Sequence, residues 1–170
     1  MAREGGVESD FAILEGMNEY FDITLDWNQI VYNLIQLGIA FLLALPVAWN
    51  RERHAHGAGL RTFPLVSVAS CAFMLVGQQV FNSADAEARV MYGIITGMGF
   101  IGGGAILKTK GNVVGTATAS SLWNTGAIGV SVAFKLYEIA LLLTLINFLV
   151  LRFARPFKKM PKDENSRNED

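Results

Sequence analysis

The strongest candidates for catalysis lie together in the first third of the chain. His54 and His56 are its two histidines, and Glu52 precedes them. Imidazole and carboxylate groups serve as metal ligands and as general acids or bases. Here they fall in a short polar segment without rigid support, so we interpret them as part of a solvated loop. We therefore predict that the chain is not an enzyme and that it holds no metal or cofactor.

Cation transport is a second function that polar residues in such a chain could support. Magnesium favours carboxylate oxygens, and a pathway for it places Asp or Glu at membrane depth. The acidic residues lie outside the apolar cores of the long hydrophobic segments, with Asp85 and Glu87 in an outer loop and Glu138 near the outer end of the last segment. This pattern argues against a magnesium transporter. A transporter or channel for magnesium or another small solute stays open as the alternative, because backbone carbonyls at a broken helix also line pores.

Glycines dominate an uncharged segment from Val90 to Leu107. In water an interior glycine costs a helix about 1 kcal/mol relative to alanine, whereas in lipid small residues let neighbouring helices approach closely. Two GxxxG pairs, Gly93 with Gly97 and Gly99 with Gly103, point in different directions on a helix. The segment therefore predicts a membrane helix that touches more than one neighbour. Its candidate packing or partner-contact residues are Gly93, Gly97, Gly99, Phe100, Gly102, Gly103 and Gly104.

The next apolar segment carries an unusual number of polar side chains. Ser120, Ser121 and Asn124 lie within about one helical turn and predict a polar seam. Such groups hydrogen-bond between membrane helices or form a docking site. The candidate contact residues here are Thr118, Ser121, Trp123 and Asn124. Asn33, Gln36, Gln78, Gln79 and Asn147, in other segments, are interpreted as interhelical hydrogen-bonding groups.

Five apolar segments have the length that a bilayer helix needs. The 170-residue chain is 52% hydrophobic and 17% charged, and its net charge of −1 indicates no nucleic-acid partner. The composition predicts an all-α integral membrane bundle of five transmembrane helices with the lipid bilayer as a partner. The predicted helices are Trp27–Trp49, Phe63–Phe81, Val90–Leu107, Val114–Phe134 and Leu136–Phe153.

Basic residues alternate between the two ends of these helices. They are enriched after the first and third helices and after the fifth. Because short cytoplasmic loops are rich in Lys and Arg, the N-terminus is predicted to lie outside and the C-terminus in the cytosol. Arg61 and Arg89 are expected to anchor helix ends at headgroup level. Asp85 is expected to pair with Arg89 in a cap on the third helix.

Three regions follow from this pattern. Residues 1–26 form an acidic extracytoplasmic leader, either a short interfacial helix or a partly ordered segment. Residues 27–155 form the transmembrane domain, and residues 156–170 form a short cytosolic tail. The GxxxG pairs also allow a homo-oligomer.

Five segments resemble, in order and spacing, the motifs of the MgtC/SapB family of bacterial inner-membrane proteins. They are Leu60–Val66, Asp85 with Arg89, Gly97–Ile106, Gly111–Gly115 and Thr118–Gly129. The chain departs from the family pattern at Asn50, where an acid is usual, at Ala117, and at Gly103, where alanine is usual. Many relatives continue into a folded cytosolic domain, in place of which we expect only the short tail. Candidate interface or loop anchors are Asn50, Arg51, Glu52, Arg61, Thr62, Asp85, Arg89 and Asn112.

The resemblance implies a multi-pass protein of the bacterial inner membrane linked to growth in low magnesium, acid stress or survival in a host. In virulence members of the family it implies restraint of the membrane ATP synthase. We accordingly expect a non-catalytic regulator of another membrane protein complex. Its expected working surface is the third and fourth helices with the joining loop Lys108–Val114.

Overall fold

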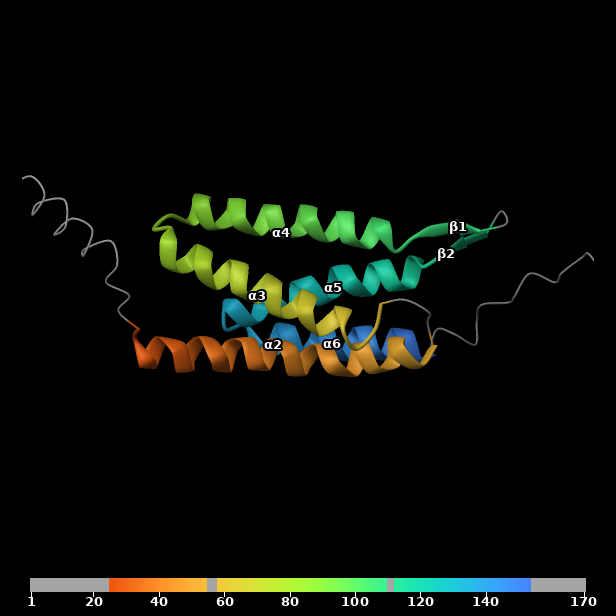
Figure 1. Ribbon diagram of the computed structural model, residues 1–170, viewed down its shortest axis with the longest axis horizontal. Coiled ribbons are helices and arrows are strands. Elements are labelled where there is room, and N and C mark those ends of the chain that lie inside the picture. Colours follow the sequence, from red (N-terminus) through yellow and green to blue (C-terminus); the bar gives the residue numbers. More distant parts are fainter. Residues whose placement is uncertain (1–24, 55–57, 110–111, 154–170) are drawn as a thin grey trace, which may run out of the picture. The chain divides into compact units, whose positions relative to one another are not determined.

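The computed structural model describes residues 25–54, 58–109 and 112–153 (Figure 1). The chain divides into two compact units, residues 1–32 and 33–170. The first unit is described only from Leu25 onward, where the Asp26 carboxylate accepts a hydrogen bond of 2.9 Å from the Asn28 N–H and caps the first helix. The predicted acidic leader falls almost wholly outside the described residues, and the predicted tail does so entirely.

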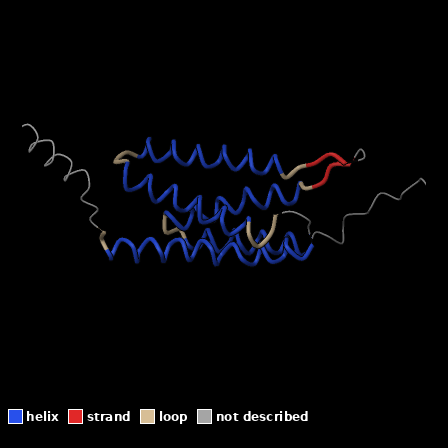
Figure 2. Tube along the Cα trace, viewed as in Figure 1, coloured by secondary structure: helices blue, strands red, loops and turns tan. Residues whose placement is uncertain are grey.

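Five helices and a small hairpin make up the described chain (Figure 2). They confirm the predicted all-α class. In order, the elements are α2 (Trp27–His54), α3 (Thr62–Val80), α4 (Ala84–Gly104), β1 (Leu107–Thr109), β2 (Asn112–Val114), α5 (Thr116–Ala133) and α6 (Tyr137–Phe153).

Four predicted helix ends were wrong by more than one residue, and the two largest differences are in α2 and α4. Helix α2 continues through His54, so the segment that was expected to be a loop is its last turn. Helix α4 begins at Ala84, well before Val90, because the Ser83 hydroxyl accepts from the Ala86 N–H at 3.3 Å and caps it. Asp85 and Glu87 in its first turn also suit the positive end of the helix dipole.

The joining loop predicted at Lys108–Val114 contains an antiparallel hairpin, and Leu107 and Val114, which were predicted to end and begin membrane helices, lie in its strands. Leu107 pairs with Val114 and Lys108 with Val113. Gly115 follows in the left-handed region with φ of 88°, and a Cβ there would lie 1.9 Å from the Ala105 carbonyl oxygen. Only glycine therefore fits between the hairpin and the start of α5.

A Schellman motif makes the short connection between α5 and α6. The Leu136 N–H donates to the Ser131 carbonyl at 2.9 Å, and the Lys135 N–H donates to the Val132 carbonyl at 2.8 Å. Lys135 itself has φ of 60°, the left-handed conformation that this motif requires. The turn reverses the chain within a few residues and places α6 against α5.

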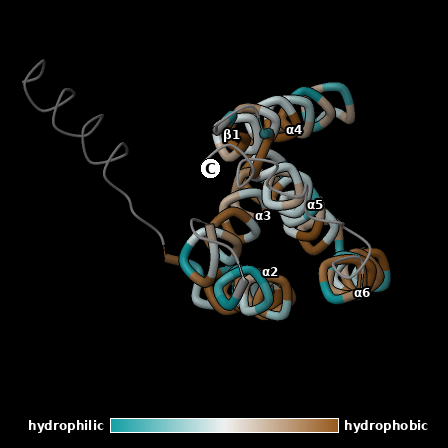
Figure 3. Tube along the Cα trace, turned by 90° about the vertical axis from the view of Figure 1, so that its right-hand side faces the viewer, coloured by the Kyte–Doolittle hydropathy of each residue, from teal (hydrophilic) through white to brown (hydrophobic). Residues whose placement is uncertain are grey.

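Helix α5 is the centre of the second unit. It packs against α3, α4 and α6, and α3 also packs against α4 (Figure 3). The closest approach is at Gly129, where a Cβ would lie 2.1 Å from the Ser67 carbonyl oxygen of α3. Gly126 similarly receives the Met98 side chain of α4. At Gly129 the backbones of α5 and α3 are thus in direct contact, whereas at Gly126 a side chain of α4 fills the space that a Cβ would take.

The outside of the bundle is largely apolar. Phe41, Leu65, Phe73, Leu142 and Val150 are among the many large hydrophobic side chains that are exposed, and hydrophobic positions reach the outer sides of α2 and α6 in Figure 3. Of the described helices, α2 and α3 are long and apolar enough to cross a membrane by length and composition. Helix α6, with 17 residues, lies at the lower limit of a bilayer helix.

Candidate functional site

A buried arginine lies at the end of α2. Arg51 is 7% exposed and the neighbouring Asn50 is 4% exposed, although the sequence placed both in a loop. The Nη2 group of Arg51 donates a hydrogen bond to the hydroxyl of Thr118 at the start of α5. The extension of α2 explains the difference, because one more helical turn carries Arg51 inside the bundle. The position near the negative end of the α2 dipole favours its charge.

Glu52, one of the predicted loop anchors, is exposed in the last turn of α2. Its carboxylate accepts a hydrogen bond of 2.9 Å from the Leu60 N–H, just before α3. A Cβ at Gly59 would lie 1.9 Å from the same carboxylate oxygen, so the glycine leaves room for it. Arg51 and Glu52 therefore join the end of α2 to the start of α5 and to the segment just before α3.

The predicted polar seam of α5 lies against α6, with one change of membership. Asn124 Nδ2 donates to the Leu143 carbonyl at 3.2 Å, and Asn147 Nδ2 donates to the Ser121 carbonyl at 3.5 Å. The exposed Ser120 instead bonds within its own helix, to the Thr116 carbonyl at 3.0 Å. The interhelical interpretation is thus confirmed for Asn124 and Asn147. Ser120 takes no part between helices, and Thr118 extends the seam toward Arg51 of α2.

Two further hydrogen bonds join α2 to α6. Tyr137 donates to Gln36 Oε1 at 2.7 Å, and the Gln36 side chain is almost fully buried. Thr144 lies 3.1 Å from the Leu43 carbonyl and 2.9 Å from the Ala140 carbonyl in its own helix. Sequence reasoning identified Gln36 but missed Tyr137 and Thr144. The signal in the sequence was a single hydroxyl at the start of an apolar helix for Tyr137 and a single hydroxyl among leucines for Thr144.

The α4 glycines lie on an open surface of the described chain. A Cβ at Gly93, Gly97, Gly99, Gly103 or Gly104 would meet nothing within 4 Å, and Phe100 is 86% exposed. Only Gly102 meets another helix, at the Ala119 backbone of α5. The two GxxxG pairs do face different ways: Gly93 and Gly97 line a groove beside α3, whereas Gly99 and Gly103 do not.

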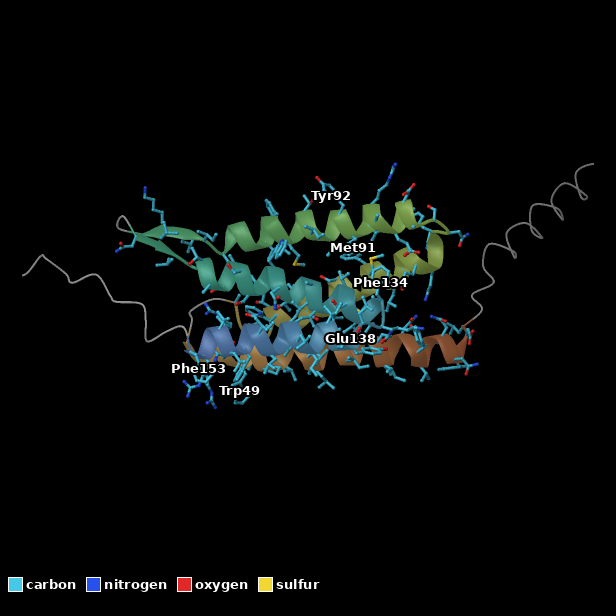
Figure 4. All side chains as sticks on the ribbon, turned by 180° about the vertical axis from the view of Figure 1, so that it is seen from behind. Trp49, Met91, Tyr92, Phe134, Glu138 and Phe153 are labelled. Carbon is cyan, nitrogen blue, oxygen red and sulfur yellow. The ribbon has the colours of Figure 1, made fainter. Side chains whose placement is uncertain are left out.

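The exposed residues Tyr92, Thr96, Gly99 and Gly103 recur at helical spacing and form one stripe, which we call the outer α4 face. Figure 4 shows Tyr92 at the edge of the bundle, with Met91 and Phe134 nearer its centre. These three residues border a hollow of about 450 Å³ between α4 and the end of α5. Of the outer α4 face, Tyr92 alone borders this hollow, and the exposure of its four residues leaves the face uncovered within the described chain.

The remaining predicted residues lie apart from the buried seam. Trp123 is half-exposed and borders a cavity of about 190 Å³ with α4. Arg61 and Thr62 lie at the start of the groove between α3 and α4. Asp85 and Arg89 are both exposed at the start of α4, which Ser83 caps, and Asn112 is exposed in the hairpin. Within the described ranges, no three His, Cys, Asp or Glu side chains gather as a metal site; His56 lies outside those ranges.

These features define a class of protein: an all-helical bundle with an apolar exterior and a buried polar seam. The sequence pattern of the MgtC family matches residues 37–160, so the chain belongs to the MgtC family. The resemblance found in the sequence motifs is confirmed.

Relatives at 33% identity support this membership. Protein SrpB of Synechococcus elongatus aligns over 79% of this chain and 80% of its own length. The Escherichia coli K12 protein named "Putative magnesium transporter YhiD" aligns over 69% of this chain and 58% of its own length. Protein MgtC of Brucella abortus aligns over 76% and 54%. The chain thus spans little more than half of the latter two relatives, and no solved structure matches it.

Proposed function

We propose that this chain is a multi-pass protein of the bacterial inner membrane that crosses the bilayer five times. The apolar exterior of the bundle supports lipid as its surroundings. The enrichment of Lys and Arg after α2, around the hairpin and after α6 supports a cytosolic C-terminus. A reporter enzyme that works only in the cytosol is expected to be active when it is fused to the C-terminus. A reporter that works only outside the cytosol is expected to be inactive there. Activity restricted to the outside would overturn this orientation.

Its proposed role is non-catalytic regulation of a membrane partner, such as the ATP synthase, under magnesium limitation, acid or host stress. The observation that carries this role is the contrast between the buried interior of the bundle, where polar side chains are hydrogen-bonded, and helix α4, where most glycines are exposed. Polar side chains inside the bundle bond to neighbouring helices, whereas α4 offers small residues with free space above them. In lipid, such a small-residue face packs against another helix.

Proton pumping by the ATP synthase in inverted membrane vesicles tests this role. Vesicles containing the chain are expected to pump more slowly on ATP than vesicles without it. Gly99→Leu is expected to remove the inhibition, because a bulky side chain on the outer α4 face keeps a partner helix away. Gly38→Leu on α2, where a Cβ also meets nothing within 4 Å, is the matched control. Equal inhibition by wild type and Gly99→Leu would contradict the proposed surface.

A transporter or channel for magnesium or another small solute is the second candidate, and the name of the YhiD relative favours it. The acidic residues Asp85 and Glu138 are exposed at helix starts rather than within the bundle, which favours the regulator. Purified chain in liposomes separates the two roles. Saturable magnesium uptake that depends on the chain would replace the regulator with the transporter.

A further inference from the structure

A groove of about 710 Å³ runs between α3 and α4. The two helices touch near their connecting turn, where Gly77 lies against Val90, and they separate toward the other end of α3 (Figure 1). Helix α5 contacts both walls, at Ser67 through Gly129 and at Met98 through Gly126. The groove is therefore wedge-shaped, narrow at the connecting turn and wide where α3 begins.

The lining of the groove is apolar except for the buried Ser70 and for two residues at its wide end. Leu65, Phe73 and Ile94 contribute to the walls, and Gly93 and Gly97 add bare backbone surface with free space above it. At the wide end lie the exposed Arg61 and the hydroxyl of Thr62. No acidic side chain is among the described residues that line it.

We propose that this groove binds an anionic phospholipid, with one acyl chain between α3 and α4 and the phosphate against Arg61. The volume falls within the range of ligand sites, roughly 300–1,000 Å³. The apolar walls fit a hydrocarbon chain, and the guanidinium pairs with a phosphate through charge-assisted hydrogen bonds. The proposed orientation places Arg61 at the cytoplasmic face, where basic sites between membrane helices bind anionic headgroups.

This inference rests on the bilayer placement of the chain but not on its partner. It also separates the two GxxxG pairs by function. Gly93 and Gly97 face a lipid chain, whereas Gly99 and Gly103 belong to the outer α4 face. Variants of the two pairs are therefore expected to have different effects.

Native mass spectrometry of the full chain in detergent tests the proposal, with phosphatidylglycerol and phosphatidylcholine as probes. The wild type is expected to retain one phosphatidylglycerol in preference to phosphatidylcholine. Arg61→Gln is expected to weaken that binding about fivefold, the effect of one basic residue near an anionic lipid. Gly97→Leu, which fills the groove, is expected to weaken binding of either lipid.

Two matched controls accompany these variants. Arg53→Gln removes another cation near the same end of the bundle, one that lies 4.8 Å from the Trp49 ring centroid, and Gly99→Leu enlarges a glycine on the other side of α4. Both are expected to retain wild-type lipid binding. The proposal would be overturned if the Arg61→Gln variant and the Gly97→Leu variant both bound phosphatidylglycerol as the wild type does. Equal retention of phosphatidylglycerol and phosphatidylcholine by the wild type would also overturn it. A dimer lost in Gly97→Leu with no change in lipid would assign the groove to a second copy.

Failure of the lipid site is distinguishable from failure of the membrane placement. A chain that stays folded and dissolved without detergent would contradict the bilayer placement itself. A chain that needs detergent but shows no preference for the anionic lipid would overturn the groove proposal alone.

Discussion

Helices α4 and α5 both carry glycines, but the two helices use them differently. In α5, Gly126 and Gly129 meet a side chain of α4 and the backbone of α3. In α4, five of the glycines meet nothing within 4 Å, and the buried residues are only Met98 and Gly102. A small residue permits close approach without specifying the partner. The comparison indicates that α5 holds the bundle together, whereas most of the α4 glycines lie exposed at the surface.

The largest expected effect comes from enlarging one glycine on each helix. Gly129→Leu is expected to destabilise the chain by at least about 3 kcal/mol, because the new side chain collides with the α3 backbone. Gly103→Leu on α4 is expected to change stability by no more than about 1 kcal/mol. Thermal unfolding in detergent, followed by circular dichroism, measures both. Similar losses in the two variants would show that α4 is as tightly packed as α5.

A smaller effect is expected at the start of α5, where Thr118 accepts a hydrogen bond from Arg51. Thr118→Val is expected to cost about 2 kcal/mol, since a hydrogen bond to a buried charged group is lost. Ser120→Ala is the control, because that hydroxyl is exposed and bonds within its own helix. The same unfolding measurement applies. An unchanged stability of Thr118→Val would show that the hydrogen bond between Arg51 and Thr118 does not stabilise the bundle.

The interhelical hydrogen bond of Asn124 provides a third comparison of α5 with α4. Asn124→Leu is expected to cost about 1 kcal/mol, the scale of a hydrogen bond between membrane helices. Thr96→Val on α4 removes a hydroxyl that bonds only to the Tyr92 carbonyl one turn away, and it is expected to be close to neutral. A greater loss in Thr96→Val than in Asn124→Leu would reverse the assignment of the interior and open helices.

An effect of similar size but opposite sign is expected at the helix ends. Lys135 after α5 has φ of 60°, so Lys135→Gly is expected to stabilise the chain by about 1 kcal/mol. Ala105 after α4 has φ of −83°, and Ala105→Gly is expected to give no gain. A rise in the unfolding midpoint for the second variant, or a fall for the first, would contradict the conformations of these two ends.

Much of the fold was predictable because apolar length and polar interruptions decide where helices lie. The five helices, the seam residue Asn124 and the different directions of the two α4 glycine pairs followed from the sequence pattern. The position of Arg51 did not, because a polar run at the end of an apolar helix resembles a loop whether or not the helix continues. The pairing of Tyr137 with Gln36 was also hidden, since it depends on how two distant helices align.

The glycines show the same limit. The run from Gly97 to Gly104 predicted close packing, yet the closest contacts lie at Gly126 and Gly129 in the next helix. Local sequence indicates how near a helix can approach, whereas the topology decides which helix fills the space. The outer α4 face could therefore be identified only once the neighbours of α4 were in place.

Photo-cross-linking in native membranes tests the central claim that α4 presents a contact surface to another membrane protein. A photoreactive residue at Thr96, on the outer α4 face, is predicted to form an adduct with a membrane subunit of the ATP synthase. The adduct is predicted to disappear when Gly99→Leu is added. The same probe at the exposed Leu145 of α6 is predicted to yield no protein adduct. Protein adducts at Leu145 with none at Thr96 would contradict the account.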